Sequence, residues 1–586
     1  MKHLLRQLKD YKKETILAPL FKMLEALFDL FVPLVVARII NVGIGGNDRA
    51  YIIRQCLLLV ALALIGLACS VTAQYFAARA ATEGAAGLRR DLFGHIQKLD
   101  FQALDTIGTS TLITRITSDV NQVQNGINMT LRLLLRSPFI VFGAMIMAFT
   151  INFKAALIFV VTIPVLSVIV FSIMRVTGPG YRNIQKRLDR IMGVTRENLT
   201  GVRVVRAFGK EQDEIARFEE ANSSLNTMQT RIGQISALMN PLTYVVVNLG
   251  IIAILYVGAR EVDSGTLLSG DVVALINYMS QILVELVKMA NTIVLISKSL
   301  ASLNRISEIL DTEPTMKFED ADRAFSDSAE AVRFDHVSLT YAGAGDESIS
   351  EISFTAEQGQ TVGIIGGTGS GKSTLVSLIS RFYDATKGSV FLFGRPITEL
   401  GRDELRSSVH VVMQKAQLFK GTIRENLLWA DRNASDEELW KALEIAQAAE
   451  VVRGKAGGLD EPVEQGGRNF SGGQRQRLTI ARALIGNPKI LILDDSFSAL
   501  DFATDAALRK ALHLLPAETT IFIVSQRTSS LKNADQIIVM DDGRMAGIGK
   551  HDDLLKTCEV YREIHESQFQ KAEDQVRHSP ARVEVE

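Results

Sequence analysis

Two adjacent carboxylates stand at the end of an apolar stretch, in "ILILDDSFSALD" at residues 490–501. The apolar run predicts a buried strand, which would present Asp494 and Asp495 at its carboxyl end. A carboxylate in that position can hold Mg²⁺ beside a bound nucleotide, usually through water. We therefore assign Asp494 to a metal site, and the neighbouring motifs decide what Asp495 does.

A glycine-rich stretch, "GIIGGTGSGKST", predicts the matching phosphate site. It follows the apolar strand "TVGII" and precedes a helix-like segment, which is the context that the G-x-x-x-x-G-K-[ST] pattern requires. Glycines let backbone N–H groups surround phosphates, Lys372 reaches the terminal phosphates and Ser373 can ligate magnesium. We predict that ATP and Mg²⁺ bind here, at Gly366, Gly367, Thr368, Gly369, Ser370, Gly371, Lys372, Ser373 and Thr374.

A third segment, "FSGGQRQRLTIARALI", opens an amphipathic helix with Ser471, Gly472, Gly473 and Gln474. A helix start that carries a hydroxyl and bare backbone favours phosphate binding. Taken alone, the same segment is an ordinary capped helix.

The rest of the chain must position these motifs, and composition divides its 586 residues into two parts. Residues 1–310 carry long apolar runs, whereas residues 332–568 read as a soluble mixture of strands and helices. Lys plus Arg (64) and Asp plus Glu (65) nearly cancel, so charge does not argue for nucleic acid. Cys56, Cys69 and Cys558 lack metal-ligand spacing, and we expect reduced thiols.

The first part contains six apolar stretches long enough to cross a bilayer, which takes about 20 helical residues. Short connections alternate with two long polar ones, and basic residues gather in the first segment and in the long connections. The positive-inside rule therefore places the N-terminus and the C-terminal part in the cytoplasm. We expect no cleaved signal peptide, because the first apolar run is long and lacks a small-residue cleavage site. The predicted spans are 15–42, 52–78, 130–152, 154–174, 237–260 and 271–297.

Ionisable groups recur inside these spans, where they are costly and usually face protein or water. In the last span, polar residues return every three or four positions, which aligns them on one helix face. This stripe predicts a water-filled substrate cavity, although a structural pairing of Glu285 with Lys288 explains it equally well. The predicted cavity residues are Glu25, Asp29, Asn277, Gln281 and Glu285.

The order of the phosphate loop, "VVMQKAQLF", "FSGGQ" and "ILILDDSFSALD" resembles the ATP-binding cassette of ABC transporters. With the six spans before it, nearly the entire chain resembles an exporter-type half-transporter. The resemblance implies an α-helical six-span transmembrane domain followed by an α/β P-loop ATP-binding cassette domain, in the plasma membrane of a bacterium, with the cassette in the cytoplasm. The implied parts are a transmembrane domain (1–310), a linker (311–331), a nucleotide-binding domain (332–568) and a C-terminal tail (569–586).

Carried over from this family, Tyr341 in "SLTYAG" matches the aromatic residue that stacks on adenine, and Gln414 matches the glutamine that couples magnesium to the membrane domain. Asp501 is assigned to the same nucleotide site. Ser471–Gln474 match the signature, which in this family closes over the ATP held by the phosphate loop of a second cassette. Tyr341 is alternatively an exposed strand aromatic. Patches near 103–110 and 208–218 fit the family's coupling helices, or are ordinary loop helices.

Two residues depart from the family pattern at the hydrolysis positions. Where the family has a glutamate that orients or deprotonates the attacking water, this chain has Asp495, which is shorter by about 1.5 Å. A displacement of about 1 Å can cost on the order of 10²-fold in rate. Where the family has a switch histidine near the γ-phosphate, this chain has Gln526, which cannot carry a proton charge. Together the two changes predict a site that binds ATP yet hardly turns it over.

The economical hypothesis is a heterodimer whose other half-transporter carries the glutamate and the histidine, as in the degenerate-site multidrug exporters of bacteria that this chain resembles. The predicted function is ATP-driven efflux of small amphipathic compounds from a cavity between the two halves, within membrane lipid. A lipid or peptide exporter, and an ATP-gated channel or regulatory subunit, remain open alternatives. Six spans and the lack of a basic stripe argue against a nucleic-acid partner.

Overall fold

The computed structural model describes residues 2–318 and 328–577. The chain forms two compact units, Met1–Gln97 with Thr109–Thr312 and Lys98–Gly108 with Glu313–Glu586. Residues 319–327 of the predicted linker and 578–586 of the predicted tail lie outside the described residues.

The first unit is helical, and its longest helices, such as α3 (Arg49–Ile96) and α8 (Phe153–Ala207), continue past their apolar runs into polar sequence. Asp48 caps the second long helix by accepting a hydrogen bond from the Tyr51 N–H, and Asn152 does the same for the Ala155 N–H. The elements are α1 (Lys2–Lys9), α2 (Lys12–Arg38), η1 (Ile39–Ile44), α3 (Arg49–Ile96), α5 (Thr109–Thr114), η2 (Arg115–Asp119), α6 (Val120–Leu133), α7 (Arg136–Ile151), α8 (Phe153–Ala207), α9 (Glu211–Ala237), α10 (Met239–Asp263) and α11 (Ser269–Leu310).

Within the described residues, six helical stretches are long and apolar enough to cross a membrane. They confirm the predicted six-span architecture. The stretches are Lys12–Ile44, Arg49–Ile96, Thr109–Ile151, Phe153–Ala207, Glu211–Asp263 and Ser269–Leu310.

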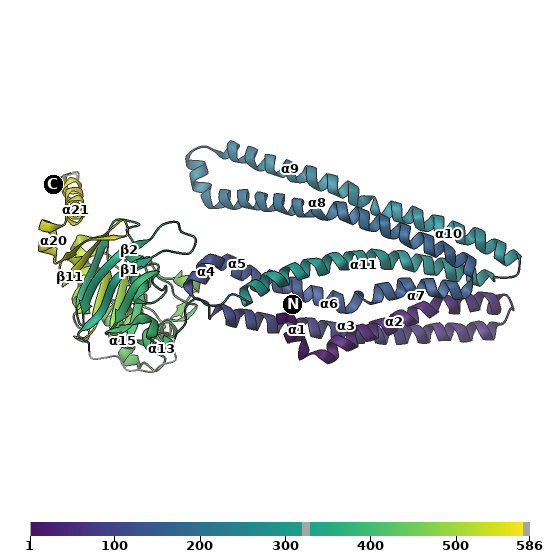
Figure 1. Cartoon of the computed structure of the whole chain (residues 1–586), viewed down its shortest axis with the longest axis horizontal. Helices are drawn as coiled ribbons and strands as arrows, with labels where there is room; N and C mark the ends of the chain where they lie inside the picture. Colours follow the sequence, from purple (N-terminus) through teal and green to yellow (C-terminus); the bar gives the residue numbers. More distant parts are fainter. Residues whose placement is uncertain (1, 319–327, 578–586) are drawn as a thin grey trace. The chain divides into compact units, whose positions relative to one another are not determined.

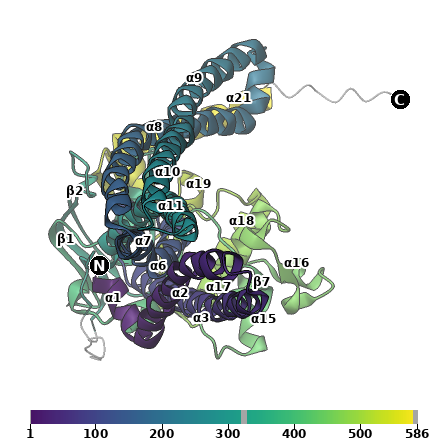
Figure 2. The same cartoon turned by 90° about the vertical axis from the view of Figure 1, so that its right-hand side faces the viewer.

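Small residues let these helices approach one another closely, as is common where lipid rather than water surrounds a bundle. Helix α3 packs along α2 with Ala73, Ala77 and Ala80 fully buried. Helix α11 contacts α2, α6, α7, α8 and α10, so it lies at the centre of the unit (Figure 1). In both views α9 lies on the far side of the bundle from α2 and α3 (Figure 2).

The described part of the second unit contains two large sheets and a small two-stranded one, β7-β8. A six-stranded sheet has the order β12-β11-β3-β10-β9-β6, with parallel pairing except between β11 and β12, and a four-stranded sheet has the order β2-β1-β4-β5. The central strands β3, β9 and β10 are almost wholly buried, which explains their continuous apolar sequences. This arrangement confirms the predicted α/β class.

The strands of this unit are β1 (Glu330–Leu339), β2 (Ile349–Glu357), β3 (Thr361–Gly366), β4 (Lys387–Leu392), β5 (Arg395–Pro396), β6 (Val409–Val412), β7 (Gly421–Thr422), β8 (Pro462–Val463), β9 (Ile490–Asp494), β10 (Thr520–Val524), β11 (Gln536–Asp541) and β12 (Arg544–Gly549). Its α-helices are α4 (Phe101–Ile107), α12 (Lys372–Ile379), α13 (Arg402–Ser408), α14 (Ile423–Leu427), α15 (Asp436–Ile445), α16 (Ala449–Arg453), α17 (Gly472–Leu484), α18 (Phe502–Leu512), α19 (Thr528–Leu531), α20 (His551–Thr557) and α21 (Glu559–Arg577).

The two patches compared with coupling helices fold differently. The patch at 103–110 covers most of α4, which belongs to the second compact unit, and the first residues of α5, which belong to the first. The patch at 208–218 is the connection Phe208–Lys210 followed by the first turns of α9, so it is not a separate helix.

Candidate nucleotide-binding site and membrane pocket

The phosphate loop lies between the end of β3 and the start of α12, as its sequence predicts. Glycine is required at Gly366, where a Cβ would come within 2.2 Å of the Met540 carbonyl oxygen. It is also favoured at Gly371, which has a φ of +94° and directly precedes α12. A pocket of about 310 Å³ opens beside Gly369–Thr374 and is completed by Glu347, Ser348, Asp542 and Gly543, which the motif did not reveal.

Lys372 folds back onto the loop that carries it. Its ammonium donates hydrogen bonds to the Gly366 carbonyl (3.0 Å), the Gly367 carbonyl and the Ser370 hydroxyl (3.2 Å). Burial lowers the pKa of Lys372, while the carboxylates of Asp495 and Asp494 partly oppose that effect. The ammonium is therefore held beside the loop, where it can exchange neutral carbonyl partners for phosphate oxygens.

Asp494 and Ser373 meet across the same loop. The Ser373 hydroxyl donates to Asp494 Oδ1 at 3.1 Å, and Asp494 is only 8% exposed. Burial raises the pKa of Asp494, and the charge of Asp495 adds to the rise. A buried carboxylate paired with a hydroxyl is a donor set that suits Mg²⁺, so the two residues fit the predicted metal site.

Asp495 lies one residue past β9 and adopts a left-handed backbone with a φ of +46°. Aspartate tolerates this region better than most side chains. Gln414 donates a hydrogen bond from Nε2 to Asp495 Oδ2 at 3.3 Å, which brings two of the predicted site residues together.

Gln526 stands at the same edge of the sheet, because β10 pairs in parallel with β9 and Val524 is aligned with Asp494. Gln526 is exposed, whereas the nearby residues Ser525 and Thr528 are buried. The two residues that depart from the family pattern therefore follow neighbouring strands.

The predicted signature forms the start of α17. Ser471 and Gln474 make a capping box, with Ser471 N–H donating to Gln474 Oε1 (3.0 Å) and Gln474 N–H donating to Ser471 Oγ (3.3 Å). Ser471 and Gly472 are exposed, and a Cβ on Gly473 would lie 3.1 Å from the Ala499 carbonyl oxygen. The signature thus has exposed backbone at the start of α17, away from the phosphate loop in sequence.

Asp501 caps α18 through the N–H and the hydroxyl of Thr504, both at 2.9 Å. These two hydrogen bonds lower the pKa of Asp501. The structure gives this residue a helix-capping position, and its role toward nucleotide remains a prediction.

Tyr341 lies beside the phosphate loop and is not a free surface aromatic. Its hydroxyl donates to Thr374 Oγ1 at 3.1 Å, and its ring meets Tyr383 edge to face at 5.0 Å. Tyr383 in turn hydrogen-bonds to Asp105 of α4. A chain of contacts therefore joins α4 to the phosphate-loop helix, and neither Tyr383 nor Asp105 belongs to a motif that could have revealed it.

In the helical unit, a pocket of about 440 Å³ contains Asp29, Asn277, Gln281 and Glu285 from the predicted cavity set. Glu25 does not line it and instead pairs with Lys22 at 2.5 Å. The sequence analysis missed Lys22, although its position three residues before Glu25 is a usable signal.

Arg136, at the start of α7, is the central cation of this pocket and was also missed. Its guanidinium lies 2.6 Å from Glu285 and 3.0 Å from Asp29. Lys288 lies 3.0 Å from Glu285. The polar stripe of the last span therefore lines a pocket and also contains an ion pair between two of its own members. The two alternatives considered for the stripe are therefore compatible.

Comparisons with known proteins match both parts of this geometry. The ABC transporter transmembrane region matches residues 15–286, and the ABC transporter family matches residues 349–498. An uncharacterized ABC transporter ATP-binding protein of Mycobacterium tuberculosis is 36% identical over 572 residues, covering 96% of this chain and 98% of the relative. This chain belongs to the ABC transporter family.

Two further likenesses refine the family assignment. The ATP-dependent lipid A-core flippase of Escherichia coli is 29% identical to this ABC transporter, covering 95% of this chain and 96% of the flippase. The structure of a bacterial Atm1-family ABC exporter with ATP bound has a TM-score of 0.78 and 23% identity, covering 96% and 98% of the two chains, and so shares the fold. The chain is thus an ABC exporter half with both domains fused, a multi-pass membrane protein with a cytoplasmic nucleotide-binding domain.

Proposed function

We propose that this ATP-driven exporter half binds ATP at its own phosphate loop, hydrolyses it slowly, and works with a second half-transporter that carries a glutamate and a histidine. The observation that carries the proposal is the position of Asp495. It directly follows the proposed metal carboxylate, its backbone is fixed, and its side chain is one carbon shorter than the family's catalytic base.

The other nucleotide residues support binding. Lys372 supplies a cation beside the loop for the phosphates, Ser373 and Asp494 would hold Mg²⁺, and Gln414 contacts Asp495 at the same edge. When bound, Mg²⁺ neutralises phosphate charge. These groups orient the nucleotide without requiring a catalytic base.

The signature supports a division of labour between two chains. Ser471 and Gly472 are exposed at the N-terminus of α17, where open N–H groups and the helix dipole favour a phosphate supplied from outside. We propose that they close over ATP bound by the second half-transporter, which performs most of the hydrolysis.

The test uses the purified chain alone and together with a candidate half-transporter that has glutamate and histidine at the two positions. We expect weak ATPase from the chain alone. In the mixed dimer, Lys372→Ala in this chain should leave measurable turnover, whereas the equivalent lysine substitution in the partner should abolish it. Robust ATPase from the chain alone that disappears with Asp495→Asn would refute the proposal.

The proposed cargo is a small amphipathic compound bound near Asp29, Asn277 and Gln281. A preference for cations is not supported, because Arg136 and Lys288 balance the carboxylates of this pocket. ATP-dependent uphill accumulation in inside-out vesicles distinguishes a pump from a channel, which cannot exceed equilibrium.

A lipid is the second candidate cargo. The flippase relative acts on lipid A-core by its name. An apolar pocket of about 500 Å³ between α8 and α10, lined by residues such as Leu157, Val161 and Leu249, has room for acyl chains. Flipping of fluorescent phospholipids in proteoliposomes, compared between wild type and Val161→Glu, separates the two: only a lipid cargo using this groove predicts a loss.

A further inference from the structure

The last described helix, α21, contacts the segment that carries Gln526. The side-chain amide of Gln568 donates from Nε2 to the Gln526 carbonyl oxygen at 2.7 Å. Its Oε1 accepts hydrogen bonds from the Thr528 N–H (3.0 Å) and the Thr528 hydroxyl (3.1 Å). One glutamine therefore fixes the main chain on both sides of Arg527.

Side chains of α21 near this contact are buried or half-buried and hydrogen-bonded to neighbouring elements. The Tyr561 side chain is fully buried and its hydroxyl lies 2.7 Å from His551 Nδ1 of α20. His565 Nδ1 lies 3.1 Å from the same Thr528 hydroxyl that Gln568 contacts. Gln568 follows His565 by one turn, so the two side chains reach α19 from one face of α21.

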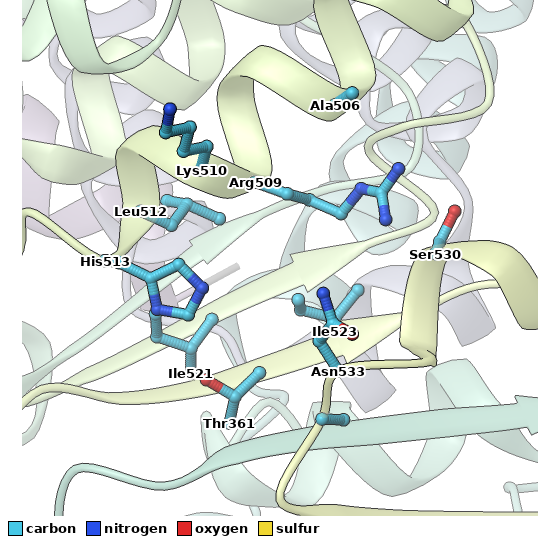
Figure 3. Close-up of a pocket in the computed structure, with 11 residues that line it drawn as sticks. Thr361, Ala506, Arg509, Lys510, Leu512, His513, Ile521, Ile523, Ser530 and Asn533 are labelled. Atoms are coloured by element: carbon cyan, nitrogen blue, oxygen red, sulfur yellow. The ribbon is translucent and has the colours of Figure 1, made fainter. Parts of the chain in front are cut away.

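The segment is also held by a side chain of α18. Arg509 donates from Nη1 to the Ser529 carbonyl oxygen at 3.0 Å and is anchored by Asp505. In Figure 3 its side chain extends from α18 toward Ser530, along a pocket of about 300 Å³. The segment Gln526–Leu531 therefore accepts or donates hydrogen bonds with side chains of two helices, and Gln526, which is exposed, is fixed through its main chain.

We propose that α21 acts as a latch on this segment and that Gln568 is a positioning residue for Gln526 at the chain's own ATP site. This inference rests on the proposed function in one respect, that ATP binds at this chain's own phosphate loop, and it takes from the family pattern that position 526 is near the γ-phosphate. A neutral glutamine contributes only directed hydrogen bonds, so its hold on a phosphate depends on where its backbone is fixed. The latch sets how long ATP stays bound.

The test compares nucleotide release from the full-length chain in nanodiscs, using a non-hydrolysable ATP analogue and ADP. Gln568→Ala should speed release of the ATP analogue by about threefold to tenfold, the scale expected for losing one or two hydrogen bonds. Release of ADP should not change, because ADP lacks the γ-phosphate. A purely structural role would alter both nucleotides equally.

Two variants sharpen the result. Gln568→Glu keeps an acceptor for Thr528 but loses the donor to the Gln526 carbonyl, so we expect an intermediate release rate. Ser567→Ala is the matched control, since its hydroxyl only bonds to Ile564 within α21. Hydrogen exchange at the Thr528 amide should accelerate in Gln568→Ala and stay unchanged in Ser567→Ala.

Unchanged exchange at Thr528, or equal effects on the ATP analogue and ADP, would overturn the latch. Fast ATP hydrolysis by the wild-type chain alone would instead refute the slow-site proposal and leave the nucleotide-release comparison intact. The two failures are therefore distinguishable in one set of preparations.

Discussion

Two neighbouring carboxylates at the end of one strand have different surroundings. Asp494 is buried and paired with Ser373, which suits a metal ligand, whereas Asp495 is partly exposed and contacts Gln414. These residues were predictable from sequence because each lies inside a short contiguous motif. Gln568 was not, because it meets Gln526 across 42 residues and belongs to no motif.

The residue-scale prediction concerns restored hydrolysis. Asp495→Glu combined with Gln526→His should raise the ATPase rate of the chain alone by about 10-fold or more, because the longer acid regains about 1.5 Å of reach. Steady-state ATPase in nanodiscs measures it, with Lys372→Ala added as a background control. An unchanged rate would show that the missing activity has another cause.

At the scale of elements, small residues and local bonds decide how closely helices pack. Gly270, at the start of α11, donates its N–H to Asn41 Oδ1 at 2.7 Å. The sequence predicted the existence of these helices from hydrophobic length, but not this contact, since a glycine near a helix start has many possible causes.

Gly270→Ala should destabilise the helical unit by about 1–3 kcal/mol, the cost of overpacking. An added Cβ would lie 2.4 Å from the Ala37 carbonyl oxygen and 2.6 Å from Asn41 Oδ1. Gly66→Ala, in α3, is the control because nothing lies within 4 Å of its Cβ position. Thermal unfolding of the full chain in detergent should show a lower midpoint for the first variant only.

The contact between α20 and α21 should weaken in acid. Burial lowers the pKa of His551 from its ordinary 6.5, His565 and Lys532 lower it further, and Asp552 opposes them. The unfolded segment therefore takes up a proton before the folded one, so stability is present above about pH 6.5 and is lost as pH falls below it.

Hydrogen exchange over residues 551–566 at pH 7.5 and 5.5, corrected for intrinsic rates, measures this effect. His551→Gln should reduce the pH dependence, since glutamine can still bond to the Tyr561 hydroxyl but does not titrate. His513→Gln, at an exposed position just after α18, should leave it unchanged. Equal pH dependence in all three proteins would contradict the assignment to His551.

For the whole molecule, the six spans, the cassette and their order followed from sequence, since each rests on local length or motif. The ion network of the helical unit did not. Arg136 joins carboxylates from two other helices, Asp29 on α2 and Glu285 on α11, and such pairings depend on the packed fold rather than on spacing along the chain.

Arg136→Ala should lower stability by about 3–5 kcal/mol, because it leaves the buried Glu285 carboxylate without its closest cation. Arg136→Lys should recover part of the loss by restoring the charge. Lys154→Ala removes an exposed partner of Glu261 and should cost less than about 1 kcal/mol. Thermal unfolding midpoints and the yield of protein in the membrane rank the three variants by stability. Similar losses for Arg136→Ala and Lys154→Ala would contradict the prediction.

The main chain at Asp495 is fixed without help from its side chain. Its N–H donates to the Val524 carbonyl oxygen at 3.1 Å, and its own carbonyl accepts from the Ser498 hydroxyl at 2.9 Å. In the standard genetic code, aspartate and glutamate differ only at the third base of the codon, and so do glutamine and histidine. Under the proposed function, the slow site is therefore an evolutionarily reversible state: a lineage under selection for faster turnover could regain both hydrolysis residues by single-base changes, without rebuilding the strand ends that present them.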